Sequence, residues 1–443
     1  MGNHSHRRRD LFVVFLTRRV IVWSVALFGL CSCGGDVYGS SSSPTEELVG
    51  ALMEWNERET LYSAIRGFVG SSWNGSDLYP EPCGWTPIQG VSCDLHDEKW
   101  YVSVMNIGSF YDNSLRCAPD ANFTHHLFDL KHLSSLSFNN CFFSPQANPV
   151  AISGLSWERL AGSLTALEFR SNPGLIGTLP PSFGSLGQLQ SLVLLENGLG
   201  GNIPFEIGNL GNLKRLVMSE SGFEGNIPDS LGRLSNLLIL DMSGNKLSGS
   251  IPTSLQGLTS LLKLDLSGNS LGGPVPGELA NLKSLVLLDL GKNNLTGGLA
   301  RWIQDMVSLE ELVMSHNPNL GGDLKAINWG NVKNLRSLDL TNIGLKGNIP
   351  DSMSNLRMLR HLGLGNNSLT GTPPRGLSLL PHIGALYLNG NSLTGQLEFP
   401  PEFYAKMRWR FSGEDNPGLC YRFPITTSAD AAPHGINPCI TAT

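Results

Sequence analysis

Residues 234–252 read LSNLLILDMSGNKLSGSIP, and residues 258–276 read LTSLLKLDLSGNSLGGPVP. The two stretches share the pattern LxxLxxLxLxxNxLxGxIP, displaced by 24 residues, with Val in place of Ile in the second. A fixed period of this size is typical of a solenoid, in which each unit buries its leucines against its neighbours. The LxL segment predicts a short strand whose leucines face inward and whose alternate residues face solvent.

The turn asparagine of this pattern anchors a longer series of coils. Eight of the ten intervals between successive anchors are 24 or 25 residues, and the other two are 31 and 26 residues. Because a small Asn side chain can hydrogen-bond local backbone, we expect the stacked asparagines to form a buried ladder. The series predicts an α/β solenoid of about eleven leucine-rich repeats. The anchors are Cys141, Asn172, Asn197, Ser221, Asn245, Asn269, Asn293, Asn317, Ile343, Asn367 and Asn391.

Two departures from the regular period carry expectations of their own. Residues 145–157 form the longer insertion, which we expect to bulge from a loop while the strands stay stacked. Ile343 has no side-chain amide, so its coil is expected to use Asn342 or water in place of the anchor.

A Gly and an Ile-Pro pair follow the anchor in several coils, as at Gly201, Ile203 and Pro204. This LxGxIP element resembles the plant-specific class of extracellular leucine-rich repeats. The resemblance implies a short second strand in each coil and a twisted, right-handed superhelix. Proline fits an edge position because no ladder N–H is needed there.

The chain ends predict a targeting segment and two caps around the solenoid. Arginines, an apolar run over residues 20–30 and then small residues give the order of a secretory signal. A signal anchor is the alternative, although the run is short for a membrane span of about 20 residues. Apolar spacing predicts a cap helix over residues 48–68. The predicted domains are a signal peptide (1–39), an N-terminal cap (40–100), the solenoid (101–397) and a C-terminal cap and tail (398–443).

Charge and hydropathy narrow the classes of partner. The chain has a formal charge of −6, and loss of residues 1–35, with five Arg and one Asp, would leave −10. An acidic protein is a poor fit to nucleic acid, whose binding depends on Lys and Arg, whereas cationic peptides or proteins stay possible. No apolar run of 18 residues follows residue 40, so no transmembrane helix is predicted in the mature chain.

Six cysteines follow the targeting segment, and six cysteines allow fifteen pairings. A buried free Cys141 is an alternative to the second of the pairings predicted below, because Cys141 occupies an anchor position. A zinc site is less favoured, since no CxxC spacing occurs and the start is secretory. The places of the cysteines in the coils suggest Cys83–Cys93, Cys117–Cys141 and Cys420–Cys439.

Four N-x-S/T sequons follow the targeting segment and are predicted N-glycosylation sites of a secreted protein. Two of them flank the anchor turn of their coils, where loops should be exposed. The four asparagines are Asn74, Asn122, Asn294 and Asn366.

Enzyme signatures give little support for catalysis in this sequence. HExxH and the kinase signatures are missing, and His125-His126 lacks metalloprotease spacing. Residues 268–272 read GNSLG, which has the GxSxG spacing but is part of the repeat pattern. Carboxylates recur in rows as a consequence of the repeat, which is weak support for paired-acid hydrolysis. We therefore predict no enzymatic activity, no catalytic residue, no metal and no cofactor.

The concave face is the predicted binding surface, because alternate strand side chains point there. Val193, Leu195 and Val217 are apolar at positions expected to be exposed, and grouped exposed apolar residues can mark an interface. A cover formed by residues 145–157 is the structural alternative. The rim of this patch would consist of Glu196, Arg215 and Glu220.

Charged residues in the same registers give two further candidates. Asp241, Asp265 and Asp289 would stack about 4.8 Å apart as an acidic stripe for a basic peptide. The alternative is that Leu-Asp-Leu-Ser is simply a frequent form of the repeat. Arg336 and Arg360 share a register on adjacent coils and could clamp a ligand carboxylate, with surface salt bridges as the alternative.

Two stretches carry a closer resemblance. Residues 61–93 read LYSAIRGFVGSSWNGSDLYPEPCGWTPIQGVSC, and residues 130–142 read LKHLSSLSFNNCF. Both resemble the Piriformospora indica-insensitive protein 2 group of plant receptor-like proteins. The resemblance implies a cell-surface repeat protein without a kinase, linked to plant responses to root-associated microbes. It supplies no ligand-binding residue.

Together these features predict a secreted plant protein that binds a peptide or protein on its concave face. Its signalling partner would be a membrane receptor kinase. The protein would be located at the outer face of the plasma membrane or in the cell wall. The alternative function is inhibition of a microbial cell-wall hydrolase. A pectin-binding wall protein would need a basic patch, which the sequence does not reveal.

Overall fold

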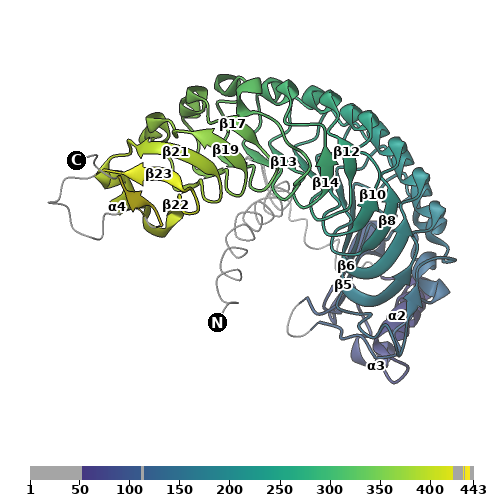
Figure 1. The fold of residues 1–443 in the computed structure, drawn as a ribbon. Coiled ribbons are helices and arrows are strands. Elements are labelled where there is room, and N and C mark those ends of the chain that lie inside the picture. The colour runs from purple at the N-terminus through teal and green to yellow at the C-terminus, as the bar shows by residue number, and fades with distance from the viewer. Residues whose placement is uncertain (1–51, 111–113, 423–432, 434, 440–443) are drawn as a thin grey trace, which may run out of the picture. The chain divides into compact units, whose positions relative to one another are not determined.

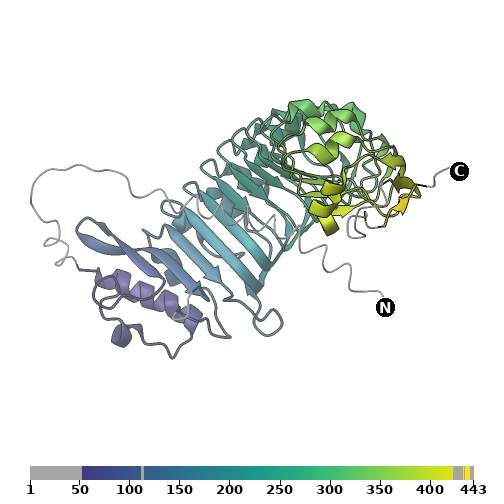
Figure 2. The same cartoon turned by 90° about the vertical axis from the view of Figure 1, so that its left-hand side faces the viewer.

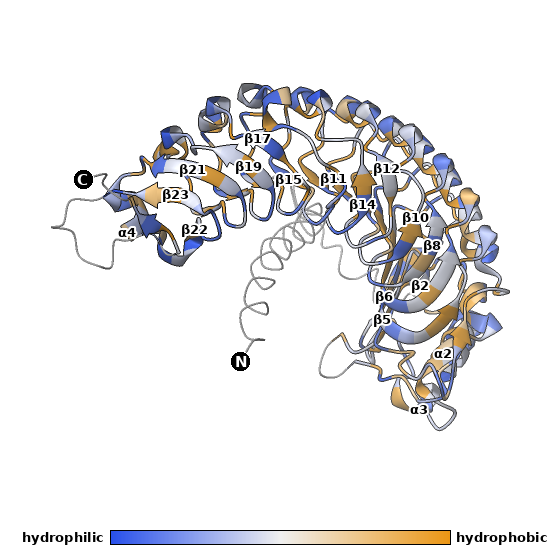
Figure 3. Cartoon of the chain, in the orientation of Figure 1, coloured by the Kyte–Doolittle hydropathy of each residue, from blue (hydrophilic) through white to orange (hydrophobic). Residues whose placement is uncertain are grey.

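The computed structural model describes residues 52–110, 114–422, 433 and 435–439, all within a compact unit that begins at Leu52. The predicted signal peptide, residues 1–39, lies outside the described residues. The unit is a solenoid in which parallel strands line the inner side and short 3-10 helices line the outer side (Figure 1). Hydrophobic and hydrophilic stretches alternate along its coils (Figure 3).

The long sheet takes one strand from each successive coil. β9 (Ile239–Asp241) pairs in parallel with β7 (Arg215–Val217) and β11 (Lys263–Asp265), which aligns Leu216, Leu240 and Leu264. These leucines are fully buried, as the LxL pattern predicts. The other strands are β1 (Val91–His96), β2 (Lys99–Gly108), β3 (Ser135–Asn139), β4 (Val150–Ala151), β5 (Ala166–Gly177), β6 (Ser191–Asn202), β13 (Leu287–Asp289), β15 (Glu311–Val313), β16 (Ser337–Asp339), β18 (His361–Gly363), β20 (Ala385–Tyr387) and β22 (Phe411–Ser412).

A second short strand follows the anchor in many coils, as the plant-type resemblance implies. Gly249, the glycine of one LxGxIP element, has a φ of 74°. A Cβ added to it would lie 2.3 Å from Asn226 Oδ1 of the preceding coil. The glycine of LxGxIP therefore permits both the turn and the close stacking. These strands are β8 (Gly222–Asn226), β10 (Lys246–Ser248), β12 (Gly272–Pro274), β14 (Asn294–Thr296), β17 (Lys346–Asn348), β19 (Ser368–Gly371), β21 (Ser392–Leu397), β23 (Gly418–Tyr421) and β24 (Asn437–Pro438).

The proline of LxGxIP starts the outer turn. Pro252 has φ of −72° and precedes η7 (Thr253–Gly257), so the fixed φ of proline suits the extended residue that enters the helix. The other 3-10 helices are η2 (His125–Asp129), η3 (Trp157–Leu160), η4 (Pro181–Ser185), η5 (Phe205–Asn209), η6 (Asp229–Arg233), η8 (Gly277–Asn281), η9 (Arg301–Asp305), η10 (Leu324–Ala326), η11 (Trp329–Asn331), η12 (Asp351–Asn355), η13 (Arg375–Leu379) and η14 (Arg408–Arg410).

The anchor asparagines form the predicted ladder. Asn293 Nδ2 donates to the carbonyl of Leu266 at 2.9 Å and to that of Leu290 at 3.2 Å. Its Oδ1 accepts the N–H of Leu271 at 3.0 Å. One side chain thus satisfies backbone groups of its own coil and of the preceding coil. Asn416 makes the same contacts beyond the last predicted anchor.

In the coil of Ile343, other groups than predicted replace the missing side-chain amide. The Ile343 carbonyl accepts the N–H of Gly321 at 2.6 Å, and the N–H of Ile343 donates to Asn367 Oδ1 at 3.1 Å. The Asn342 side chain instead contacts His316 Nδ1 at 3.4 Å. The prediction that Asn342 replaces the anchor is therefore wrong, because backbone of the coil and the next asparagine take that role.

The N-terminal cap packs a helix beside the first strands (Figure 2). The helix α2 (Trp55–Val69) begins later than predicted and is followed by α3 (Gly75–Leu78). Leu61, Ile65 and Phe68 are fully buried, as expected for its apolar face. Leu52 and Trp55, which fall within the predicted helix range, are 70% and 68% exposed. Leu52 lies before the helix, where helical spacing no longer governs side-chain direction.

An aromatic cluster joins this cap to the first coils. The rings of Phe68 and Phe138 lie 4.8 Å apart, and those of Phe138 and Phe169 lie 5.2 Å apart. Trp157 is fully buried against Phe183, with ring centroids 5.1 Å apart. The cluster covers the open end of the solenoid with rings rather than with leucines.

The insertion at residues 145–157 leaves the pairing of β3 with β5 in register, as predicted. However, it does more than bulge. Its strand β4 pairs with Leu175 and Ile176, and Trp157 Nε1 donates to the Ile152 carbonyl at 3.0 Å. The extra residues therefore add a strand and a core side chain.

Disulfides join the three predicted cysteine pairs. Cα–Cα distances are 5.7 Å for Cys83–Cys93, 5.1 Å for Cys117–Cys141 and 4.8 Å for Cys420–Cys439. The middle bridge ties a cap loop to the first anchor position. At the other end, the helix α4 (Pro401–Met407) follows the last coils, and the third bridge joins Cys420 of β23 to the residue after β24.

The ladder makes a stability prediction. Asn293→Ala should lower the free energy of unfolding by about 1–3 kcal/mol, because it leaves the Leu271 N–H unpaired and removes one of the two amide donors to the Leu266 carbonyl. Urea unfolding measures the loss, and amide exchange at Leu271 locates it. The control is Asn281→Ala, which removes an exposed bond to Gln256 and should cost less than about 0.5 kcal/mol. Equal losses in the two variants would contradict a special role for the ladder.

Candidate functional site

The inner face of the long sheet presents side chains in columns, because the strands pair without register shifts from β6 to β20. One column runs through Glu168, Val193, Val217, Asp241, Asp265, Asp289, Val313 and Asp339. The column two residues earlier includes Arg215, Ile239, Lys263, Leu287, Glu311 and His361. Residues far apart in sequence thus become neighbours at the spacing of adjacent strands, about 4.8 Å.

The predicted apolar patch is only partly exposed. Val193 is fully buried and Val217 is 8% exposed, whereas Leu195 is partly exposed. The expectation of solvent exposure is therefore wrong for both valines. Leu195 is the part of this patch that is available to a ligand.

An ion pair across two strands accounts for the burial of Val193. Arg215 of β7 reaches Glu168 of β5, with Nη1 and Oε1 3.9 Å apart. β6 lies between them, so the long Arg side chain passes over the strand that holds Val193. Glu168 also accepts from Arg170 at 2.9 Å. Burial lowers the pKa of Arg215, with the charge of Glu168 opposing that effect.

The two predicted rim glutamates lie at the turn that ends each strand. Glu196 and Glu220 are exposed, and both have φ above 50°. Ser171 Oγ donates to Glu196 Oε2 at 2.7 Å. Partial burial, and then the charge of Glu196, raise the pKa of Glu220. The structure therefore brings these two carboxylates together, as their register predicts.

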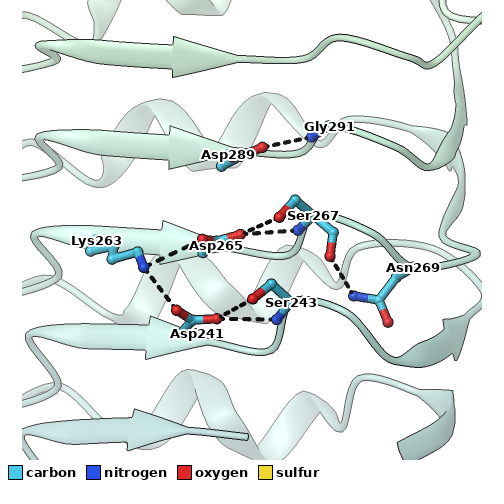
Figure 4. A network of polar contacts seen from close by, with 8 residues as sticks. All are labelled: Asp241, Ser243, Lys263, Asp265, Ser267, Asn269, Asp289 and Gly291. Atoms are coloured by element: carbon cyan, nitrogen blue, oxygen red, sulfur yellow. Dashed lines mark hydrogen bonds and ion pairs between the residues drawn. The ribbon is translucent and has the colours of Figure 1, made fainter. Parts of the chain in front are cut away.

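The predicted acidic stripe is built around a lysine (Figure 4). Lys263 Nζ lies 2.8 Å from Asp241 Oδ2 and 3.3 Å from Asp265 Oδ2. The second carboxylate oxygen of each Asp accepts from Ser243 or Ser267, in each case from Oγ at 2.7 Å. Asp241 and Asp265 are thus largely satisfied within the protein. The sequence analysis missed Lys263, which its place two residues before Asp265 could have revealed.

Asp289 is the stripe residue with the fewest partners. Its Oδ1 accepts the N–H of Gly291 at 2.9 Å, and Gly291 has no hydroxyl to replace those of the two serines. Burial, and then the charge of Asp265, raise the pKa of Asp289 to about 8. With this pKa, Asp289 is largely protonated near pH 7, so the stripe carries less negative charge than its three carboxyl groups suggest.

The arginine pair departs from a simple clamp. Arg336 Nη1 lies 3.2 Å from Glu310 Oε2, so a neighbouring carboxylate already engages it. Arg360 is exposed and has no ion pair within the described residues. Arg360 precedes β18 and Asn366 follows it, so a glycan on Asn366 would lie at the other end of the strand.

The four sequon asparagines are all exposed. Asn74 precedes α3 and Asn122 lies in a loop before η2, both near the N-terminal end of the solenoid. Asn294 begins β14, and Asn366 precedes β19. On the repeats, both sequons thus lie where strands of the long sheet end.

The described part of the chain contains no cluster of three or more His, Cys, Asp or Glu side chains arranged to hold a metal ion. Among the same residues, none of the helices has the length and apolar character needed to cross a membrane.

Sequence comparisons agree with the repeat architecture. A family model for the leucine rich repeat matches residues 211–271 and 333–393. Piriformospora indica-insensitive protein 2 of Arabidopsis thaliana is 55% identical over 172 residues, or 39% of this chain and 38% of that protein. Receptor like protein 29 of Arabidopsis thaliana is 36% identical over 157 residues, or 34% of this chain and 32% of that protein. The alignments therefore span less than half of either relative.

Solved structures show the same fold. The plant peptide hormone receptor RGFR1 in complex with RGF2 has a TM-score of 0.54 and 30% identity over 68% of this chain and 49% of that one. The structure of PEPR1-AtPEP1 has a TM-score of 0.59 and 28% identity, and the match covers 82% of this chain and 51% of that one. A plant ice-binding protein has a TM-score of 0.54 over 88% of this chain and 99% of that one. At 20% identity, this match shows a likeness of fold alone. These matches show the leucine-rich-repeat fold and a similarity to plant receptor-like proteins and receptor ectodomains.

The lysine-centred network predicts a pH-dependent stability. Lys263→Met should lower the free energy of unfolding by about 2–4 kcal/mol at pH 8, because it leaves two largely buried carboxylates without their cation. Without the lysine, the pKa of Asp265, which burial already raises and the charge of Lys263 lowers, should rise further in the folded protein. An acid with a raised folded pKa costs stability above its unfolded pKa near 4, so the deficit should shrink as the pH falls toward 4.

Urea unfolding at several pH values measures this deficit. Lys246→Met, at an exposed position on β10, is the matched control and should change little at any pH. Lys263→Arg keeps the charge and should recover part of the loss. A deficit that is the same at pH 4 and pH 8 would argue that Lys263 acts only by packing.

Proposed function

We propose that this chain is an extracellular receptor-like protein without enzymatic activity that recognises a peptide or protein ligand on the inner face of its long sheet. The observation that carries this proposal is the unbroken register of that face. It presents side chains of successive coils in columns over a length that suits an extended ligand.

Two of the structurally similar receptors support a peptide-sized ligand. RGFR1 in complex with RGF2 and PEPR1-AtPEP1 are 30% and 28% identical to this chain. An extended peptide can follow the columns of an inner face, with alternate side chains directed toward the strands. The three disulfides and the exposed sequons fit the secretory route that such a receptor requires.

The accessible inner-face residues suggest where the ligand contacts the chain. Leu195 and Val313 are partly exposed and lie at the two sides of the Asp–Lys network. Glu196 and Glu220 add exposed carboxylates beside Leu195. Asp241 and Asp265 stabilise the face through Lys263, so their direct role would be secondary. A basic side chain of the ligand would be attracted to the two exposed glutamates.

Signal transfer is proposed to occur through a receptor kinase in the plasma membrane. The chain would sit at the outer face of that membrane or in the cell wall. The similarity to Piriformospora indica-insensitive protein 2 supports a role in responses to root-associated microbes.

A pull-down with the secreted, glycosylated protein tests the proposal in plant root extracts and microbial culture filtrates. We expect to recover a receptor kinase or a peptide ligand with the parent protein. The double variant Leu195→Glu/Val313→Glu should reduce that recovery about tenfold, since buried apolar anchors dominate interfaces. Val193 is unsuitable for this test because it is fully buried, and its replacement would disturb the fold.

The matched control is Phe205→Glu/Thr253→Glu, which places the same charges on exposed positions of the outer turns. It should retain full recovery. Equal losses in the two double variants would reject the inner face as the binding surface. Recovery of a microbial hydrolase with loss of its activity would reject the receptor role and favour the inhibitor.

A further inference from the structure

Four exposed cations gather on one edge of the solenoid, where Lys333 and Arg357 extend the pair of arginines predicted from the sequence. Lys333, Arg336, Arg357 and Arg360, here called the basic edge, all precede strands of the long sheet. The Arg360 N–H donates to the Arg336 carbonyl at 2.7 Å, so these two residues lie on adjacent coils at the same height. The chain as a whole has a formal charge of −6, which makes a local group of four cations a distinct surface.

The other two cations, Lys333 and Arg357, lie in tight turns that precede the strands. The N–H of Leu335 donates to the Val332 carbonyl, and that of Leu359 donates to the Leu356 carbonyl, at 3.1 and 2.9 Å. Lys333 and Arg357 therefore occupy equivalent places within successive turns, about one strand spacing apart. The basic edge thus consists of two rows, with two cations in each row.

Carboxylates neutralise only part of this group. Glu310 pairs with Arg336 at 3.2 Å, and Glu311 is the next residue on the same coil. Within the described residues, Lys333, Arg357 and Arg360 have no ion pair. These three side chains remain able to bind the carboxylates of another molecule.

Apolar side chains lie along the same edge. Val307, Met358 and Leu379 are 51%, 36% and 60% exposed. Leu379 ends η13 at the place where Asn355, two residues before Arg357, ends η12 on the preceding coil. Met358 lies between Arg357 and the buried Leu359, and Asn334 Nδ2 donates to the Val307 carbonyl at 2.9 Å across adjacent coils. Arginine and methionine are enriched at protein interfaces. No sequon asparagine lies on this edge among the described residues, so N-linked glycans would leave it open.

We infer that the basic edge is a second docking surface, distinct from the inner face, which binds an acidic segment of a partner protein. The unpaired cations would bind its carboxylates, and Val307, Met358 and Leu379 would bury its apolar side chains. An acidic polysaccharide such as polygalacturonate could satisfy the cations. It is the less favoured occupant because it offers no apolar side chains for the three exposed residues.

The test uses the secreted, glycosylated protein and a synthetic peptide of alternating Glu and Leu, with fluorescence anisotropy as the readout. Binding should weaken as NaCl rises from about 50 to about 200 mM, because salt screens exposed charges. Lys333→Gln/Arg357→Gln/Arg360→Gln should weaken binding roughly tenfold, as expected for the loss of three exposed charge pairs. Leu379→Ser should weaken it about threefold through loss of apolar contact.

The matched control is Lys325→Gln/Lys346→Gln/Arg375→Gln, which removes the same charge from exposed positions on η10, β17 and η13. It should bind within about twofold of the parent, as expected if local rather than net charge controls binding. Unchanged thermal unfolding of both triple variants would show that neither is misfolded.

Three outcomes would overturn the inference. An equal loss in both triple variants would show that net charge alone controls binding. Absence of peptide binding to the parent would remove the docking surface. Tighter binding of polygalacturonate, with the same loss in the basic-edge variant and no effect of Leu379→Ser, would identify a carbohydrate surface instead. Because the inner-face variants leave the basic edge intact, failure of this inference is separable from failure of the proposed function.

Discussion

The fold depends on one requirement: each coil must satisfy the backbone groups of its bends while no water reaches them. The anchor asparagines meet it with both ends of their amides, as Asn293 does between the Leu266 carbonyl and the Leu271 N–H. Because unpaired buried amide groups cost free energy, these contacts keep adjacent coils in a fixed register. The columns of the inner face and the rows of the basic edge both follow from that register.

The sequence allowed prediction of every feature that the period controls. Leu240 and Leu264 recur at 24 residues, so their burial and pairing could be read from spacing alone. Features that depend on the conformations of long side chains could not be predicted from spacing. Arg215 crosses β6 to reach Glu168, and Lys263 joins carboxylates of two strands. The conformation of Arg215 depends on a charge two strands away, and that of Lys263 depends on charges of its own and the adjacent strand, which a linear pattern does not display. Ile343 shows the same limit, since its coil is completed by the carbonyl of its own backbone.

The two candidate surfaces differ in how the fold uses their charges. On the inner face, Asp241 and Asp265 are engaged by Lys263 and by serine hydroxyls, so much of the visible acidity is structural. On the basic edge, only Arg336 is engaged by a carboxylate of the described residues. Charge that the fold leaves unpaired is a better guide to a partner than charge counted from sequence. The basic edge also supplies the basic patch that the sequence did not reveal.

The aromatic cluster of the cap affects the order in which the molecule forms. Phe68, Phe138 and Phe169 interlock within the first coils, whereas later coils are held mainly by leucines and the ladder. A growing chain leaves the ribosome N-terminus first, so this ring-rich end is complete before the remaining coils exist. It can then serve as the template on which each new coil adds in turn. Assembly in this direction exposes one growing strand edge at a time, which limits the chance of pairing with another chain.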